Sequence, residues 1–217
     1  MVTRQQSSIY GREGPEAGGF FPGPHDVFER LLESGIVVVP NPLTDENAGL
    51  VVARLLQLAA SDRRNDVFLY LNCEARSATA TLAVLDVMEA LPADVVTVCL
   101  GQAGKGAAVL LAAGTKHKRW ILPNARVVLG HGSEEFSGAT GDLEVRAREV
   151  LRQRASLDRI LARLSGKPED DVSADAAREL VLTAPEARAY GIVDRIVERR
   201  SLPRLDLFVP GEFPEPG

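Results

Sequence analysis

The sequence predicts an α/β protein built from consecutive strand–helix units around a largely parallel sheet. Short, continuous apolar runs such as 67–71 and 95–100 alternate with segments such as 45–60, where apolar residues recur every three to four positions. Continuous apolar strands are typical of parallel sheets covered on both faces, and the alternation is typical of βα units. With 217 residues, 45% of them hydrophobic, the chain is long enough to bury most of its apolar surface in one core.

In the first half of the chain, apolar runs predict strands, and helical periodicity with polar caps predicts helices. The expected elements are a helix over 26–33, a strand over 36–40, a helix from a cap at Thr44 to residue 60, a strand over 67–71, a helix over 77–91, a strand over 95–100, and an apolar helix that ends near Gly114.

The second half is expected to hold short strands over 118–122 and 126–129, a glycine-rich loop over 130–141, and the longest helix over 142–164. Thr183-Ala-Pro-Glu186 is a capping box that predicts a short helix ending at Gly191, followed by a last strand over 192–197. The long helix carries six arginines. Either they form a solvated face, or the helix projects outward to meet a partner subunit.

Glycine and proline are concentrated at both ends of the chain. We expect a flexible N-terminal arm over 1–25, a single domain over 26–200 and a proline-rich tail over 201–217. Phe20-Phe21 stands out in the arm as a pair of aromatic residues that can dock on this chain or another.

Composition and charge exclude several classes of function. A formal net charge of −5 lacks the basic balance that nucleic-acid binding needs. No apolar run approaches the ~18 residues of a membrane span, and no secretory leader is evident, so a cytoplasmic protein with no membrane partner is expected. Cys73 and Cys99 are expected as buried thiols, and His25, His117 and His131 lack metal-ligand spacing, so no metal or cofactor is expected.

The stretch from Cys99 to Gly114 is predicted to be a strand end, a turn of small residues and an apolar helix. Sharp strand-to-helix turns present nucleophiles in α/β proteins, because the helix N-terminus favours negative charge. Lys105 lies at this turn, and its ammonium opposes that field.

Four groups of motifs resemble the proteolytic subunit of the Clp protease, ClpP, over roughly residues 26–199. They are Leu69-Tyr-Leu-Asn72 with Ser77-Ala-Thr-Ala80, Gly101-Gln-Ala103 with Leu110-Leu-Ala-Ala-Gly114, Lys118-Arg119 with Leu122-Pro-Asn-Ala-Arg-Val127, and Glu186-Ala187 with Ala189-Tyr-Gly-Ile-Val-Asp194. The resemblance implies a crotonase-like fold of stacked β-α units with a protruding long "handle" helix. It also implies heptameric rings paired into a tetradecamer around a proteolytic chamber, with an AAA+ unfoldase docked outside.

The resemblance places the catalytic residues of the family on positions that have changed. The serine of the family falls on Lys105, its histidine on Gly130 and its aspartate on Glu179. His131 is one position too late, and its side chain is expected to point away from the site, because neighbouring residues in a strand face opposite ways.

The oxyanion loop of the family carries paired glycines, and here these positions hold Ala75 and Arg76. Side chains at these positions restrict the backbone and the approach of substrate. Loss of one oxyanion donor alone costs about 10²- to 10³-fold in rate.

Three interpretations of Lys105 remain open. It can form a Ser-Lys dyad with Ser77 or Ser133, a salt bridge with Glu74, Glu134 or Glu135, or it can be solvated. The salt bridge is favoured, because it would satisfy a partly buried ammonium.

Three aromatic residues match places where the resemblance implies pockets for the unfoldase. They are Phe68, Tyr70 and Trp120, and ordinary core packing explains them equally well.

The sequence therefore favours a proteolytically inactive, structural ClpP-like subunit, in rings of its own or mixed with active paralogues. The alternatives are an active hydrolase with a rearranged site that uses Lys105, and a crotonase-like protein that binds acyl-CoA.

Overall fold

The computed structural model describes residues 24–60, 66–132 and 140–197, with the backbone alone for 24–26 and 140–146. Within these residues a seven-stranded sheet has the order β1-β2-β3-β4-β7, and β5 and β6 branch from β3. The strands are β1 (Ile36–Val38), β2 (Val67–Ala75), β3 (Val95–Lys105), β4 (Arg119–Ile121), β5 (Arg126–Val128), β6 (Val181–Thr183) and β7 (Arg195–Ile196). All pairs except β5–β6 are parallel, which confirms the predicted α/β class.

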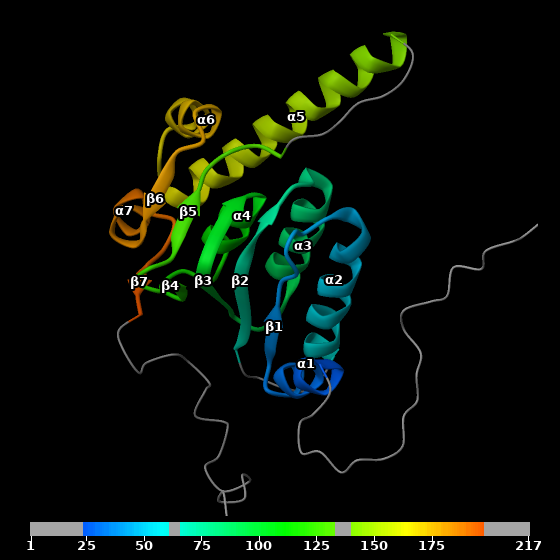
Figure 1. Cartoon of the computed structure of the whole chain (residues 1–217), viewed down its shortest axis with the longest axis vertical. Coiled ribbons are helices and arrows are strands. Elements are labelled where there is room, and N and C mark those ends of the chain that lie inside the picture. The colour runs from blue at the N-terminus through cyan, green and yellow to red at the C-terminus, as the bar shows by residue number, and fades with distance from the viewer. Residues whose placement is uncertain (1–23, 61–65, 133–139, 198–217) are drawn as a thin grey trace, which may run out of the picture.

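The helices gather mainly on one face of the sheet (Figure 1). They are α1 (Pro24–Glu33), α2 (Asp45–Ala60), α3 (Ala78–Ala90), α4 (Gly106–Ala112), α5 (Thr140–Ser165), α6 (Glu169–Ala177) and α7 (Ala184–Tyr190). Figure 1 shows α2, α3 and α4 against the sheet, whereas α5 begins far outside and runs back toward it. None of the helices in the described ranges is long and apolar enough to cross a membrane.

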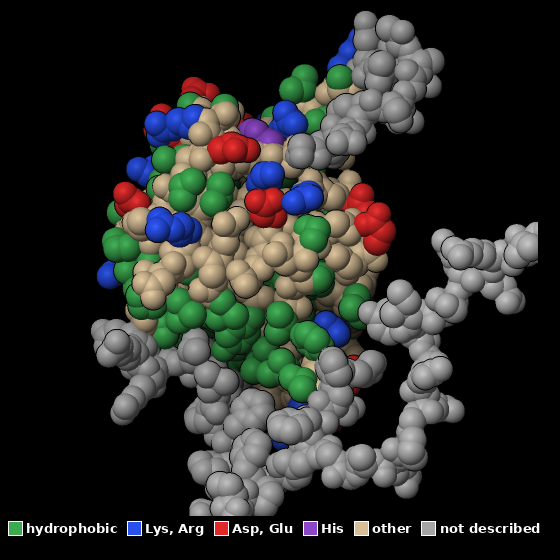
Figure 2. Space-filling view, viewed as in Figure 1, with side chains coloured by type: hydrophobic (Ala, Val, Ile, Leu, Met, Phe, Trp, Pro, Cys, Tyr) green, Lys and Arg blue, Asp and Glu red, His purple; other side chains and the backbone are tan. Residues whose placement is uncertain are grey.

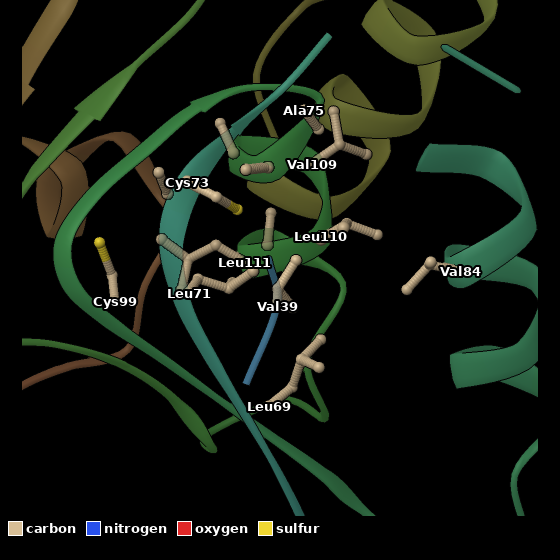
Figure 3. Packing of buried hydrophobic residues seen from close by; sticks show 14 of the residues in the cluster. Val39, Leu69, Leu71, Cys73, Ala75, Val84, Cys99, Val109, Leu110 and Leu111 are labelled. Atoms are coloured by element: carbon tan, nitrogen blue, oxygen red, sulfur yellow. The ribbon is translucent and has the colours of Figure 1, made fainter. Parts of the chain in front are cut away.

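Two apolar clusters lie on opposite faces of the sheet. The larger one joins the sheet to α2, α3, α4 and part of α5. Figure 3 shows Leu110 and Leu111 of α4 packed among side chains such as Leu71 of β2 and Val84 of α3. The smaller cluster holds Ile36, Phe68, Tyr70, Val96 and Val98.

Strands β2 and β3 run past the ends that the sequence predicts, residues 71 and 100. Their register shifts between Leu71 and Cys73, and the Asn72 side chain accepts a hydrogen bond from the Gln102 backbone N–H (3.2 Å). Polar residues interrupt the apolar pattern here, but the ladder continues until Ala75 lies opposite Lys105. β4 pairs with the first part of β3 and β5 with its last part, so the sheet divides near the site.

The C-terminal part departs most from expectation. Helix α6 and strand β6 were not predicted, and α5 begins at Thr140 rather than at residue 142. The capping box is confirmed, since the N–H and hydroxyl of Thr183 donate to the Glu186 carboxylate (2.8 and 2.6 Å). Gly191 ends α7 with φ +95°, a conformation that favours glycine.

Arg119 joins the ends of three helices. Its Nη1 donates to the carbonyls of Ala112 (3.4 Å), Leu164 (3.2 Å) and Gly191 (2.9 Å), which lie at or near the C-termini of α4, α5 and α7. Its Nη2 pairs with Asp194 (2.6 Å). The guanidinium thus satisfies carbonyls that have no partner at helix ends.

Candidate functional site

The site is built on the turn at Lys105, where β3 passes directly into α4. Lys105 has φ 58° and ψ −123°, a backbone conformation that non-glycine residues rarely adopt. The next residue must be small, because a Cβ on Gly106 would overlap the hydroxyl of Thr81 on α3. All residues of α4 are buried, so the packing of this helix fixes the position of the turn that precedes it.

Three positions far apart in the sequence meet at this turn. A Cβ built on Gly130 would lie 3.7 Å from Lys105 Cγ and 3.6 Å from Glu179 Cγ. Glu179 lies between α6 and β6 with φ 50°. The structure therefore brings together the three positions that the resemblance assigns to the serine, histidine and aspartate of the family. They hold an ammonium, a hydrogen and a carboxylate.

Lys105 forms the ion pair that the sequence favoured. Its Nζ lies 3.7 Å from Glu74 Oε2, and its side chain is only 16% exposed. Glu74 also lies 3.5 Å from Arg76 Nε, so one carboxylate faces two cations. The other acidic candidates, Glu134 and Glu135, lie outside the described residues.

Ser77, the candidate for a Ser-Lys dyad that lies within the described residues, has hydrogen-bond partners other than Lys105. The Ser77 hydroxyl donates to Asp45 Oδ1 (2.5 Å), and its oxygen accepts the Ala80 N–H (3.1 Å) as the N-cap of α3. Ser77 thus stabilises a helix end. The second candidate, Ser133, lies outside the described residues.

The positions of the oxyanion loop are committed to the sheet. Ala75 is buried opposite Lys105, and an isolated parallel bridge pairs it with Leu43. The Arg76 N–H donates to the Leu43 carbonyl (3.2 Å). This N–H is therefore already paired within the chain, and the adjoining side chain is a bulky guanidinium.

His131 is held by the long helix. Its Nε2 lies 2.8 Å from Asp158 Oδ1, and Asp158 is buried on α5. Gly132, the next residue, also contacts α5, since Arg154 Nη2 donates a hydrogen bond to its carbonyl (3.1 Å). Sequence reasoning missed Asp158 and Arg154. Their spacing of four, beside the apolar Leu157 and Leu161, is the signal that places them on the inward face of a helix.

A small recess, with room for little more than one water molecule, lies between the turn and α5. It is lined by Ala75, Arg76, Ala78, Gly106, His131, Gly132, Val150, Gln153, Arg154 and Leu157. Figure 2 shows basic and acidic side chains mixed over the upper part of the visible face, near α5, whereas the lower part is apolar.

The three aromatic candidates meet on one face of the sheet. Phe68 and Tyr70 are 6% and 8% exposed, and the Phe68 and Trp120 ring centroids are 6.4 Å apart. Burial raises the pKa of Tyr70 above its ordinary value. All three therefore pack within this chain, and their role in docking remains a prediction.

The cysteines are poor nucleophiles. Cys73 and Cys99 are free and buried, and burial raises the pKa of each thiol to about 12. Within the described part of the chain, no three His, Cys, Asp or Glu side chains cluster in a way that would hold a metal ion.

Comparison with known proteins gives a consistent result. The model of the Clp protease family matches residues 23–200. The chain is 39% identical over 180 residues to a protein of Frankia casuarinae described as ATP-dependent Clp protease proteolytic subunit 2. The match covers 83% of each chain.

Proposed function

The chain belongs to the Clp protease family, and we propose that it is a proteolytically inactive subunit that serves a structural or regulatory role in a ring assembly. The observation that carries the proposal is the meeting of Lys105, Gly130 and Glu179 at the turn before α4. The backbone geometry for presenting a nucleophile is present there without a hydroxyl or an imidazole at those positions.

The chemistry of peptide hydrolysis supports this reading. Acyl transfer by a serine peptidase needs a hydroxyl to attack the carbonyl, a base to take its proton and N–H donors for the oxyanion. Lys105 replaces the hydroxyl with an ammonium paired to Glu74. Gly130 offers no base, and the Arg76 N–H already has an acceptor.

The family implies ring assemblies that work with Clp ATPases. For this chain we propose rings that contain only this subunit or rings mixed with active paralogues. In either ring the subunit has a structural role and does not catalyse peptide hydrolysis. Docking of an AAA+ unfoldase at Phe68, Tyr70 and Trp120 is part of the same proposal, supported by their meeting on one face of the sheet.

A peptidase assay tests the proposal directly. The purified chain, freed of host paralogues, is incubated with a small fluorogenic peptide and with a fluorophosphonate probe for active serines. We expect neither turnover nor labelling. Turnover that copurifies with this chain and persists at every purification step would overturn the proposal.

Restoring the missing groups gives a sharper second arm. A Cβ on Gly130 meets its neighbours at 3.6–3.8 Å, which is ordinary contact, so a side chain can enter there. We expect the triple variant Lys105→Ser, Gly130→His, Glu179→Asp to gain peptidase activity, and Lys105→Ser alone to gain none. Adding Ala75→Gly and Arg76→Gly should raise the rate by a further factor of about 10².

A hydrolase that uses Lys105 is the second candidate. The observation in its favour is that this lysine is largely withdrawn from water, which is one way that proteins activate an amine. If the wild-type chain hydrolyses a peptide or ester and Lys105→Ala abolishes that activity while the fold is kept, this candidate replaces the first.

A further inference from the structure

The smaller apolar cluster lies on the face of the sheet that α2, α3 and α4 do not cover. Its members are Ile36, Phe68, Tyr70, Val96 and Val98. Among the described residues, the apolar side chains packed against it come from strands of the same sheet, except Leu31 of α1. Figure 1 shows α2, α3 and α4 on the other side of the sheet. An apolar sheet face is normally buried against a second layer, so a further segment is expected over this one.

One row of residues on this face leads to the strand after which the chain continues to its C-terminus. The strand register aligns Val38, Tyr70, Val98, Trp120 and Arg195 across β1, β2, β3, β4 and β7. The described chain ends shortly after this row at Val197, whose N–H donates to the Ile121 carbonyl of β4 (2.9 Å). The C-terminal residues therefore depart from beside Trp120.

The proline-rich tail contains an apolar run that suits a sheet face. The run is Leu205-Asp-Leu-Phe-Val209, and Pro203 and Pro210 flank it. A residue that precedes proline is restricted to extended conformations. In an extended chain alternate side chains point the same way, so Leu205, Leu207 and Val209 would share one side.

The run is close enough to reach every strand of the row. Eight residues lead from Val197 to Leu205, and an extended chain of that length spans up to about 26 Å. The order β1-β2-β3-β4-β7 separates β7 from β1 by four strand spacings, which is about 19 Å. No part of the fold has to move for the run to lie across the row.

Arg195 adds a matching charge at the edge of the row. Its side chain is exposed, and its Cζ lies 5.9 Å from the centroid of the Trp120 ring. Within the described part of the chain Arg195 forms no salt bridge. Asp206 lies between Leu205 and Leu207, so its carboxylate points away from the sheet when the two leucines point toward it. The guanidinium above Trp120 is then a suitable partner for it.

From these observations we propose that residues 205–209 dock on the row from Val38 to Trp120 of the same chain and form the second layer over this face. The proposal goes beyond the proposed function, because it concerns the tail and holds whether or not the chain cleaves peptides. An unfoldase that binds Phe68, Tyr70 and Trp120 has to displace the tail, which therefore regulates access to this surface.

Trp120 reports on the docking, because it is the only tryptophan of the chain and lies in the row. Deletion of residues 202–217 should shift its fluorescence emission to longer wavelengths and increase its quenching by acrylamide, since the ring then meets water. A synthetic peptide of residues 202–211, added to this deletion variant, should reverse both changes. Emission and quenching that stay the same after the deletion would overturn the proposal.

Two point variants of the full chain locate the contact within the tail, and they decide the question if the deletion variant fails to fold. Leu207→Ser should expose Trp120, because it removes the central apolar side chain of the run. Phe213→Ser is the matched control, since Phe213 is an apolar residue of the same tail beyond Pro210, and it should leave the emission unchanged. Equal changes in both variants, or no change in either, would contradict docking through residues 205–209.

Two other occupants of this face would give different results. If a second copy of the chain covers it, dilution of the full chain exposes Trp120. If the N-terminal arm covers it, deletion of residues 2–23 exposes Trp120 and deletion of the tail does not. Either result would overturn the proposal, which predicts an emission that depends on neither concentration nor the arm. None of these measurements involves hydrolysis, so their failure leaves the proposed inactive subunit unaffected.

Discussion

Lys105 adopts a backbone conformation that favours glycine, although the residue at this position carries a side chain. Its φ of 58° and ψ of −123° lie where a Cβ is strained, and such conformations cost about 1–3 kcal/mol. The surroundings maintain it, because Ala75 pairs with Lys105 in the ladder and α4 is buried immediately after it.

Replacing Lys105 by glycine and by alanine separates backbone strain from the side chain. Both variants lose the Glu74 ion pair, but only alanine keeps a Cβ. We therefore expect Lys105→Gly to be more stable than Lys105→Ala by about 1–3 kcal/mol in urea denaturation. Equal stabilities would show that the turn relaxes once the lysine is gone.

The sequence anticipated some contacts of this site and missed others for a physical reason. A salt bridge of Lys105 was favoured with Glu74 as one of three acidic candidates, and the structure pairs it with Glu74. The contact of His131 with Asp158 was not foreseen, because it depends on which face of α5 turns inward and how far that helix reaches back. The capping serine at position 77 was expected to begin α3, yet its bond to Asp45 needed the tertiary structure.

At the scale of elements, α3 and α4 approach closely through Gly106. Thr81 faces this glycine and donates its hydroxyl proton to the Ser77 carbonyl (2.8 Å). Overpacking at such a contact typically costs about 1–3 kcal/mol. The site thus depends on a glycine that carries no chemistry.

Gly106→Ala tests this contact. The added Cβ would overlap the Thr81 hydroxyl, so we expect a loss of about 1–3 kcal/mol in the free energy of unfolding. Gly49→Ala is the matched control, since Gly49 lies within α2 and a Cβ there meets nothing within 4 Å. That control should gain up to about 1 kcal/mol from helix propensity. A Gly106→Ala variant as stable as the wild type would refute the close approach.

The elements that the sequence did not predict share weak local signals. Helix α6 reads Glu-Asp-Asp-Val-Ser-Ala-Asp-Ala-Ala, in which Val172 and Ala176 are the buried residues, so its apolar period is hard to detect. Strand β6 has three residues and exists through pairing with β5, more than fifty positions earlier in the chain. Elements with a strong period or cap, such as α2 and α7, were predicted because their signals are local.

Asp194 links β7 to β4 and the helix ends through Arg119. Burial alone would raise the pKa of this carboxyl, but hydrogen bonds from Arg119 outweigh it and lower the pKa below its ordinary value. A depressed pKa in the folded state means that the ionised group stabilises the fold above pH ~4. This stabilisation is lost as the pH falls through the folded value.

Asp194→Asn should therefore cost about 3 kcal/mol or more at pH 7, because it leaves Arg119 buried without its counter-charge. The difference between wild type and variant should shrink as the pH falls from 5 to 3, measured by urea denaturation at each pH. Asp94→Asn is the control, because Asp94 pairs with Lys118 at an exposed position and should change stability far less. A difference that stays constant with pH would contradict this role.

At the scale of the whole molecule, α5 carries a large apolar side chain out of the body of the protein. Leu151 is 62% exposed and lies on the helix that Figure 1 shows projecting from the sheet. Its neighbour Arg152 is 73% exposed, so this stretch has a polar and an apolar side chain side by side. If this helix meets a partner subunit, as the resemblance to the family implies, each leucine buried there would contribute about 1–2 kcal/mol.

Size-exclusion chromatography with mass measurement tests this role for Leu151, on the chain alone and after co-expression with an active paralogue. We expect particles whose mass is many multiples of the 23.3 kDa chain, and we expect Leu151→Ser to reduce that mass because each contact loses its apolar burial. Arg152→Ser, one position along the same helix, should keep the wild-type mass, since its long side chain forms an exposed pair with Glu149. If Leu151→Ser particles keep the wild-type mass while Arg152→Ser particles dissociate, the helix meets its partner through charge rather than apolar contact. If both variants keep it, the rings join through another surface.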